Sequence, residues 1–404
     1  MSQKGLDGFF EEYLNTEPLF INKKVLQSNY TPDLITHREE LIQQIAKILA
    51  PALRQQKPSN LFIYGKTGTG KTLSIRSTTN HITKLATERN IPLKILYINC
   101  KLKKVADTEY RLIAELARQF GKEIPATGLP TEEVYHIFFR AVTEQDQLII
   151  LILDEIDQLV KKIGDEVLYN LTRANSELEK SQISIIGISN DLIFADNLDP
   201  RVKSSLSEEE LVFPPYNALQ IQDILRHRAS LAFKDDCITS GVIEKCAAYA
   251  AREHGDARRA LELLRVAGEV AERKRSLHID INHIDEAEEK IERDRVLDVV
   301  ITQPKQFQAA LYSILKVYGQ KKDFIFTGEV YEVYKKICSD TDLLPLTQRR
   351  FSDIIAELDM LGIITARVIS KGRYGRTREI SLAVPESTIP KIHTIVKEAL
   401  DLQE

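Results

Sequence analysis

The sequence predicts an α/β protein in three parts: a parallel β-sheet covered by helices, a wholly helical segment, and a C-terminal unit of three helices and a β-hairpin. Short apolar runs alternate with helical patterns between residues 37 and 213, which is typical of a parallel sheet with both faces covered. The pattern from Tyr216 to about Asp298 is helical throughout, and a separate unit begins at about Thr302. The expected domains are residues 1–215, 216–298 and 299–404.

The expected elements follow from the spacing of apolar residues and from the turn residues between them. Strands of the sheet are expected at 61–64, 94–99, 148–153, 183–188 and 210–213. Helices between them are expected at 37–49, 71–89, 105–121 and 131–143. The C-terminal unit should hold helices at 306–318, 327–338 and 347–361 and strands at 363–369 and 377–382, which is a winged-helix pattern.

The composition of the 404-residue chain is typical of a globular protein, with 43% hydrophobic and 28% charged residues. The formal net charge of −4 does not favour a nucleic-acid partner by itself, so any such surface has to be local. The four cysteines lack the paired spacing of a zinc site, which favours reduced thiols. The most apolar run, 148–153, is too short to cross a bilayer, and the start lacks a signal-peptide pattern. We therefore expect a cytoplasmic protein without a membrane partner.

The loop after the first strand has the spacing of a phosphate-binding loop, because Gly65, Gly70, Lys71 and Thr72 fit G-x-x-x-x-G-K-[ST]. Small residues there let backbone N–H groups close around phosphate oxygens at a helix N-terminus. The Lys71 amine can reach the β- and γ-phosphates, and the Thr72 hydroxyl can ligate Mg²⁺. A chance glycine-rich turn is disfavoured, because strand, loop and helix occur in the required order. The predicted nucleotide-binding loop is Gly65, Lys66, Thr67, Gly68, Thr69, Gly70, Lys71 and Thr72.

Candidate catalytic residues follow the third and fourth strands. Asp154 and Glu155 stand where a Walker B pair belongs, with Asp154 holding Mg²⁺, usually through water, and Glu155 polarising the attacking water. Two acids can also cap the next helix, but the phosphate loop favours the catalytic interpretation. Asn190 could orient water or contact the γ-phosphate, or simply end its strand. Arg201 and Arg258 could offset charge on the γ-phosphoryl group, although arginines on helices commonly form surface salt bridges.

The hairpin of the C-terminal unit is basic at its tip and follows a helix that begins with polar and basic residues. A helix N-terminus beside a basic hairpin is one way to hold duplex DNA. The alternative is a solvated hairpin tip, because glycines and basic residues are common in exposed turns. The candidate DNA-binding residues are Gln348, Arg349, Arg350, Lys371, Gly372, Arg373, Tyr374, Arg376 and Arg378.

Taken together, these motifs resemble the archaeal origin recognition complex/cell-division-cycle type replication initiators, which are AAA+ ATPases. The resemblance spans nearly the whole chain. It rests on the motifs at 65–72, 153–157, 189–190, 198–205 and 212–216, on Gly-Asp-Ala-Arg-Arg-Ala at 255–260, and on the winged-helix pattern. It implies an AAA+ P-loop parallel sheet with a helical lid, followed by a winged-helix DNA-binding domain.

The resemblance also implies roles for individual residues. Asn190 would be sensor 1, Arg258 would be sensor 2 in the lid, and Arg201 is similar to the arginine finger that acts on a neighbour's nucleotide. The nucleotide would further contact Tyr216, Ile224 and Arg228 of the lid and, around the adenine, Tyr30, Ile35 and Arg38. Residues 101–130 occupy the place of a DNA-contacting insertion, although the 105–120 helix also fits ordinary packing. The candidates in this insertion are Lys101, Lys103, Lys104 and Arg118.

The function that the resemblance implies is ATP-dependent initiation of DNA replication. Such a protein binds double-stranded origin DNA, acts with other initiator subunits, helps load the replicative helicase, and uses slow ATP hydrolysis as a switch. Its cofactors would be ATP or ADP and Mg²⁺, and it would be associated with the nucleoid in the cytoplasm. The alternative is a nucleotide-gated regulatory or signalling ATPase whose winged helix binds protein or acts in transcription. A clamp loader would require a different C-terminal collar domain.

Overall fold

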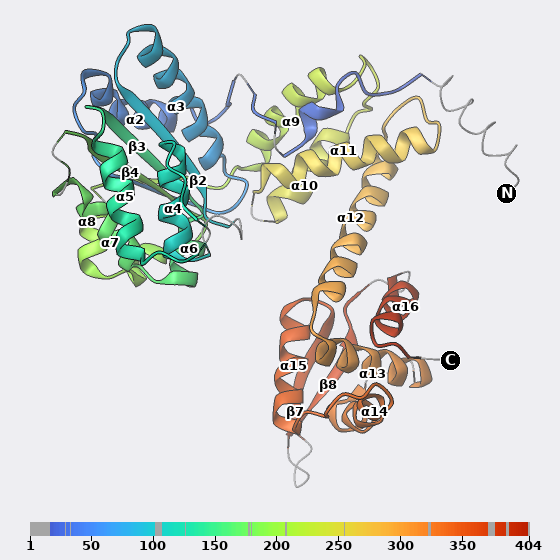
Figure 1. Cartoon of the computed structure of the whole chain (residues 1–404). Coiled ribbons are helices and arrows are strands. Elements are labelled where there is room, and N and C mark those ends of the chain that lie inside the picture. Colours follow the sequence, from blue (N-terminus) through green and yellow to red (C-terminus); the bar gives the residue numbers. More distant parts are fainter. Residues whose placement is uncertain are drawn as a thin grey trace, which may run out of the picture. The chain divides into compact units, whose positions relative to one another are not determined.

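The computed structural model forms two compact units, residues 1–284 and 285–404 (Figure 1). The boundary between them falls inside α12 (Ile281–Thr302), so this helix begins in the first unit and ends in the second. The structure describes residues 17–28, 30–32, 34–101, 107–125, 127–176, 178, 180–206, 208–253, 255–321, 325–370, 376–384 and 388–402.

The first unit is built on a five-stranded sheet with the order β2-β3-β4-β1-β5. Its strands are β1 (Leu61–Tyr64), β2 (Leu93–Asn99), β3 (Leu148–Asp154), β4 (Gln182–Ser189) and β5 (Glu209–Val212). Every pairing between neighbouring strands is parallel, as predicted, and each strand ends within one residue of its expected bounds. Because parallel strands end at the same edge, β1, β3 and β4 bring their carboxyl-terminal residues together.

Helices cover both faces of this sheet (Figure 1). One face packs against α2 (Glu39–Leu49) and α3 (Lys71–Glu88). The other packs against α4 (Glu109–Gln119), α5 (Thr131–Thr143), α6 (Ile156–Ile163) and α7 (Glu166–Arg173). Successive strand residues alternate between the two cores: Ile63 of β1 faces α2 and α3, whereas Phe62 faces the opposite core. Two layers of helices therefore bury a sheet that is apolar on both sides.

Helix α4 begins later than expected, at Glu109, because Thr108 caps it by accepting a hydrogen bond from the backbone N–H of Arg111. The sequence pattern did not identify α6, α7 or α8 (Pro200–Leu206) as separate helices.

A helical region follows the sheet, as predicted, with α9 (Ala218–Ala232), α10 (Val242–Arg252), α11 (Ala257–Arg273) and the start of α12. The N-terminal segment is tied to these helices. Phe20 forms a β-bridge with Phe233, and their ring centroids lie 4.6 Å apart. A Cβ at Gly268 of α11 would lie 2.6 Å from the Phe20 ring, so this helix position requires glycine. The 3-10 helix η1 (Lys23–Leu26) continues this segment toward residues 30–36.

The second unit is a winged helix, which confirms the prediction. It contains α13 (Lys305–Lys321), α14 (Thr327–Asp340) and α15 (Gln348–Met360), and an antiparallel sheet with the order β6-β8-β7. The strands are β6 (Ile325–Phe326), β7 (Ile364–Ser370) and β8 (Arg376–Leu382). The two-residue β6 and the final helix α16 (Ile389–Ala399) were not predicted.

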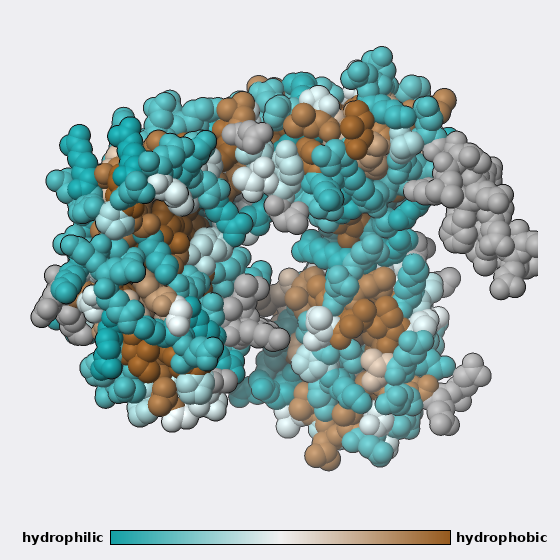
Figure 2. All heavy atoms as spheres, turned by 45° about the horizontal axis from the view of Figure 1, so that its top comes forward, coloured by the Kyte–Doolittle hydropathy of each residue, from teal (hydrophilic) through white to brown (hydrophobic). Residues whose placement is uncertain are grey.

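Hydrophilic side chains cover most of the face shown in Figure 2, with smaller hydrophobic patches between them. None of the helices in the described ranges is long and apolar enough to span a membrane. The four cysteines are buried and no disulfide joins them.

Candidate nucleotide-binding site

The phosphate loop lies between β1 and α3 and depends on two glycines. Gly68 and Gly70 have φ angles of 71° and 90°, in the left-handed region that side chains disfavour. A Cβ at Gly68 would lie 1.7 Å from Asp256 Oδ1, and one at Gly70 would lie 2.9 Å from Tyr216 Oη. Asp256 and Tyr216 belong to the helical lid and its linker, so the lid packs directly against the loop.

Lys71 is buried at the centre of the loop, with 5% of its surface exposed. Its amine donates hydrogen bonds to the carbonyls of Gly65 (2.6 Å) and Lys66 (2.7 Å) and to Asn190 Oδ1 (2.9 Å). Burial, and then the nearby charge of Arg258, lower the pKa of Lys71 to about 8, so the amine is still mostly charged at neutral pH. The structure thus brings together Lys71 of α3 and Asn190 after β4, which are far apart in the sequence.

Asp154 ends β3 beside the loop and its carboxylate accepts three hydrogen bonds. Oδ2 accepts from Thr72 Oγ1 (2.9 Å) and Tyr97 Oη (2.6 Å), and Oδ1 accepts from the backbone N–H of Glu155 (3.0 Å). A hydroxyl and a carboxylate in contact are hard oxygen donors, which fit Mg²⁺. Burial, and then Asp154, raise the pKa of Tyr97 to about 12, so Tyr97 stays a hydrogen-bond donor.

Glu155 occupies the turn between β3 and α6 with φ 57°, an uncommon conformation for a residue with a side chain. Its Oε2 lies 3.9 Å from the Lys101 amine, so Lys101, predicted to contact DNA, lies beside the predicted catalytic glutamate. Asp157, on the next turn, is buried and accepts a hydrogen bond from Ser189 Oγ (3.3 Å) and a longer one from the backbone N–H of Asn190 (3.4 Å). Asp157 therefore supports the loop that carries Asn190, a role that the sequence did not indicate.

A cavity adjoins the phosphate loop, between the sheet and the lid. Apolar and aromatic side chains form much of its wall, and cationic side chains line it as well. This combination suits a nucleotide, whose nucleobase is apolar on its faces and whose phosphates are negatively charged. Of the predicted nucleotide-binding residues, Tyr30, Ile35, Gly68, Gly70, Thr72, Tyr216, Ile224, Arg228 and Arg258 line this cavity. Arg228 also donates to the backbone carbonyl of Val25 (3.2 Å) and lies 4.5 Å from the Tyr30 ring centroid, so it links the N-terminal segment to the lid.

Arg38, which was expected beside the adenine, is not among the residues that line this cavity. Arg38 is 3% exposed, and its guanidinium donates hydrogen bonds to the carbonyls of Thr69 (2.9 Å) in the phosphate loop and Pro214 (2.5 Å) after β5. Its guanidinium lies 3.8 Å from the ring centroid of Tyr216. Burial lowers the pKa of Arg38. Arg38 therefore joins the phosphate loop to the segment that leads into the lid.

We expect Arg38→Met to lower the free energy of unfolding by about 2–3 kcal/mol, because it leaves the buried carbonyl of Thr69 and the part-buried carbonyl of Pro214 without their charged donor. Denaturant unfolding measures this loss. Arg54→Met, at an exposed position, is the matched control. Equal unfolding midpoints for the two variants would show that Arg38 does not hold the loop.

The two arginines predicted to offset charge on the γ-phosphate, Arg258 and Arg201, lie in different places. Arg258 follows the capping residue Asp256 at the start of α11, where Asp256 accepts a hydrogen bond from the Arg258 backbone N–H (2.8 Å), and Arg258 lines the cavity. The Arg201 side chain is 70% exposed, pairs with Asp199 at 3.0 Å and lies over the Tyr169 ring. Arg201 is not among the residues that line the cavity of its own chain.

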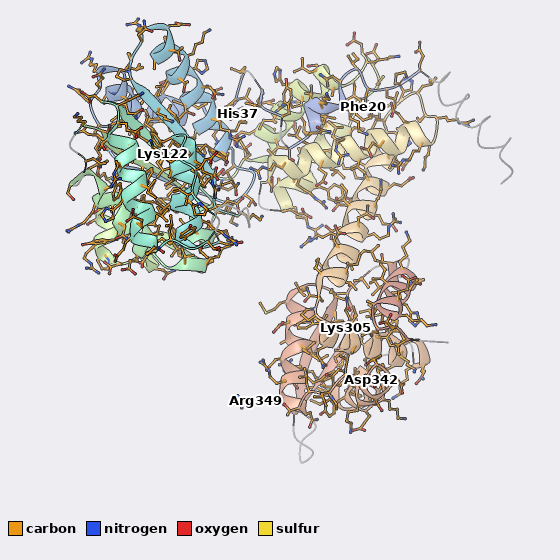
Figure 3. All side chains as sticks on the ribbon, viewed as in Figure 1. Phe20, His37, Lys122, Lys305, Asp342 and Arg349 are labelled. Carbon is orange, nitrogen blue, oxygen red and sulfur yellow. The ribbon has the colours of Figure 1, made fainter. Side chains whose placement is uncertain are left out.

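Three of the predicted DNA-binding residues of the C-terminal unit lie at the start of α15. Gln348, Arg349 and Arg350 are exposed there, and Figure 3 labels Arg349 on this unit. Arg350 lies 3.7 Å from Asp353. Arg378 of β8 donates to the carbonyl of Ser352 (2.7 Å) and so ties the hairpin to α15.

The other candidates divide into described and undescribed residues. Lys371, Gly372, Arg373, Tyr374, Lys103 and Lys104 lie outside the described residues, and Arg376 is placed only as the first residue of β8. Arg118 of α4 is exposed and pairs with Glu115 at 3.1 Å. The opposite face of α4 is buried in the core, so packing explains most of this helix.

A phosphate loop at the carboxyl edge of a parallel sheet, next to a lid that carries an arginine, defines a AAA+ type of ATPase. Family models agree: an AAA domain matches residues 54–191, the Cdc6 AAA+ ATPase-type lid domain matches 222–289, and the CDC6 C-terminal winged helix domain matches 298–391. The chain belongs to the Orc1/Cdc6 family of DNA replication initiators.

Individual relatives place the chain within this family. It is 53% identical to ORC1-type DNA replication protein 1 of Methanosarcina acetivorans over 96% of this chain and 94% of the relative. It is 52% identical to the ORC1-type DNA replication protein of Pyrococcus abyssi, over 95% and 91%. Among solved structures, the Aeropyrum pernix ORC1 protein in complex with DNA matches with a TM-score of 0.82 and 44% identity, over 94% of this chain and 97% of that one.

Proposed function

We propose that the chain is an ATP-dependent replication initiator that binds origin duplex DNA and helps load the replicative helicase, with slow ATP hydrolysis as a switch. The observation that carries this proposal is the meeting of Lys71, Asp154, Asn190 and Arg258 at one site, in a chain 53% identical to an ORC1-type DNA replication protein. The 44% identical Aeropyrum pernix protein, whose structure contains DNA, supports the DNA-binding part.

The nucleotide chemistry follows from the positions of the side chains. Backbone N–H groups of the loop and the Lys71 amine bind the phosphates, while the apolar cavity wall takes the adenine. Thr72 and Asp154 would hold Mg²⁺, which neutralises charge on the phosphates when it is bound. Glu155 orients the attacking water, and Asn190 positions it against the γ-phosphate. These residues stand at the ends of β3 and β4, so rigid strands fix the catalytic groups.

The lid makes the site a switch. Asp256 packs on Gly68, and Arg258 lines the same cavity, so a bound triphosphate changes the contacts that hold α11 against the loop. Arg201 is exposed and acts on the nucleotide of a neighbouring initiator subunit, which keeps hydrolysis slow in a single chain.

DNA binding is assigned to the C-terminal unit and to the insertion after β2. The start of α15 reads base edges in the major groove, while the basic hairpin contacts phosphates. Lys101, Lys103, Lys104 and Arg118 add phosphate contacts from the insertion.

Nuclease footprinting tests this proposal, with replication-origin duplex from the source genome compared with random duplex of equal length. We expect protection of the origin at protein concentrations that leave random DNA open. Arg373→Ala/Arg376→Ala should weaken DNA binding about ten-fold or more, because each substitution removes a predicted phosphate contact. The salt dependence of binding should fall as well, since fewer counterions are released. The matched control, Lys391→Ala/Lys397→Ala on α16, removes two cations from another helix and should bind normally.

Equal and fully salt-sensitive binding to both duplexes would remove sequence recognition from the proposal. A chain that binds nucleotide but no DNA would instead support the regulatory or signalling ATPase.

A further inference from the structure

Tyr97 contacts the Walker B carboxylate from a neighbouring strand. In the parallel pairing of β2 with β3, Tyr97 lies beside Ile152. Asp154 stands two residues beyond Ile152, so the side chains of Tyr97 and Asp154 project from the same face of the sheet. Tyr97 Oη donates to Asp154 Oδ2 over 2.6 Å. This length is typical of a hydroxyl bound to an ionised carboxylate, which is among the stronger hydrogen bonds in proteins.

The same carboxylate oxygen, Asp154 Oδ2, also accepts a hydrogen bond from Thr72, the other predicted Mg²⁺ ligand. Thr72 Oγ1 lies 2.9 Å from Asp154 Oδ2, and the backbone N–H of Glu155 holds the other oxygen at 3.0 Å. Thr72 belongs to α3, directly after the phosphate loop, and Glu155 is the next residue in the chain after Asp154. Tyr97 is therefore a support that reaches Asp154 from a separate strand of the sheet.

The ring of Tyr97 is itself held in place. The guanidinium of Arg76, on α3, lies 4.2 Å from the ring centroid, a cation–π distance. Arg76 lines the nucleotide cavity together with Thr72. Tyr97 thus stands between a cavity-lining cation and the carboxylate, and its hydroxyl has a defined direction.

We propose that Tyr97 is a positioning residue that fixes the Asp154 carboxylate for Mg²⁺, and so sets how strongly Mg²⁺ supports nucleotide binding. The inference rests on the proposed nucleotide site. Hydrogen-bond partners of metal ligands orient them, and losing one such partner typically weakens metal affinity about 10- to 100-fold. Tyr97→Phe removes the hydroxyl and leaves the ring beside Arg76.

The test titrates Mg²⁺ into the full chain with a fluorescent ADP analogue and follows bound nucleotide. We expect Tyr97→Phe to raise the half-saturating Mg²⁺ concentration about ten-fold, with unchanged affinity in EDTA. Tyr64→Phe is the matched control, because Tyr64 lies on β1 and its hydroxyl is 3.4 Å from Glu210, away from Asp154. This control should titrate like the wild type.

Identical Mg²⁺ curves for Tyr97→Phe and the wild type would overturn the inference while leaving the proposed function intact. Weaker binding by Tyr97→Phe in EDTA as much as in Mg²⁺ would also overturn it, because Tyr97 would then support the loop and not the metal. A wild-type chain that binds no nucleotide in either condition would contradict the proposed function itself.

Discussion

Lys71→Ala is expected to abolish nucleotide binding at concentrations that saturate the wild-type chain. The amine is buried and its three oxygen partners lie within 2.9 Å, so alanine removes the cation that binds phosphate and leaves two loop carbonyls without their donor. Truncating one partner of a buried charged contact costs about 2–5 kcal/mol, or roughly 30- to 5,000-fold in affinity. Isothermal titration with ADP and ATP measures this loss.

Lys84→Ala is the control for this prediction, because Lys84 is an exposed residue of the same helix, α3. It removes an equal charge without touching the loop and should bind nucleotide normally. Binding by Lys71→Ala within a few-fold of this control would mean that the loop does not hold phosphates.

Glu155→Gln is expected to retain nucleotide and to lose hydrolysis by roughly 10²- to 10⁴-fold, the usual contribution of a general base. Glutamine keeps the size of the side chain but cannot accept the proton of the attacking water. Glu155 lies outside the phosphate loop, and its carboxylate is 3.9 Å from the Lys101 amine, so nucleotide affinity should change little. Single-turnover release of phosphate from bound ATP measures the rate.

The exposed Glu132 of α5 supplies the control, since Glu132→Gln makes the same substitution away from the site. Hydrolysis by Glu155→Gln at the control's rate would show that the general-base assignment is wrong.

The elements that could be predicted from the sequence are those with a local pattern. Strands β1 and β3 are short apolar runs, and the phosphate loop is a contiguous motif in which glycine, lysine and threonine each have a fixed place. The two-residue strand β6 and the breaks between α6 and α7 have no comparable pattern, because short segments take their structure from tertiary contacts.

The supporting residues of the site could not be predicted, because they depend on strand register and on contacts between distant segments. Arg38 meets Thr69 and Pro214 only after the lid linker folds back on the loop. Tyr97 reaches Asp154 through the pairing of β2 with β3. The sequence places Tyr97 two residues before the end of β2, in a strand that also carries Lys94 and Asn99, and this pattern does not identify Asp154 as its partner.

The most direct test of nucleotide-controlled DNA binding compares the Glu155→Gln chain loaded with ATP with the same chain loaded with ADP, on one origin duplex at one salt concentration. The two forms differ only in the γ-phosphate and in any change that it causes in the contacts between the lid and the phosphate loop. The account predicts separate binding curves or footprints for the two forms. Superimposable curves and identical footprints would contradict it.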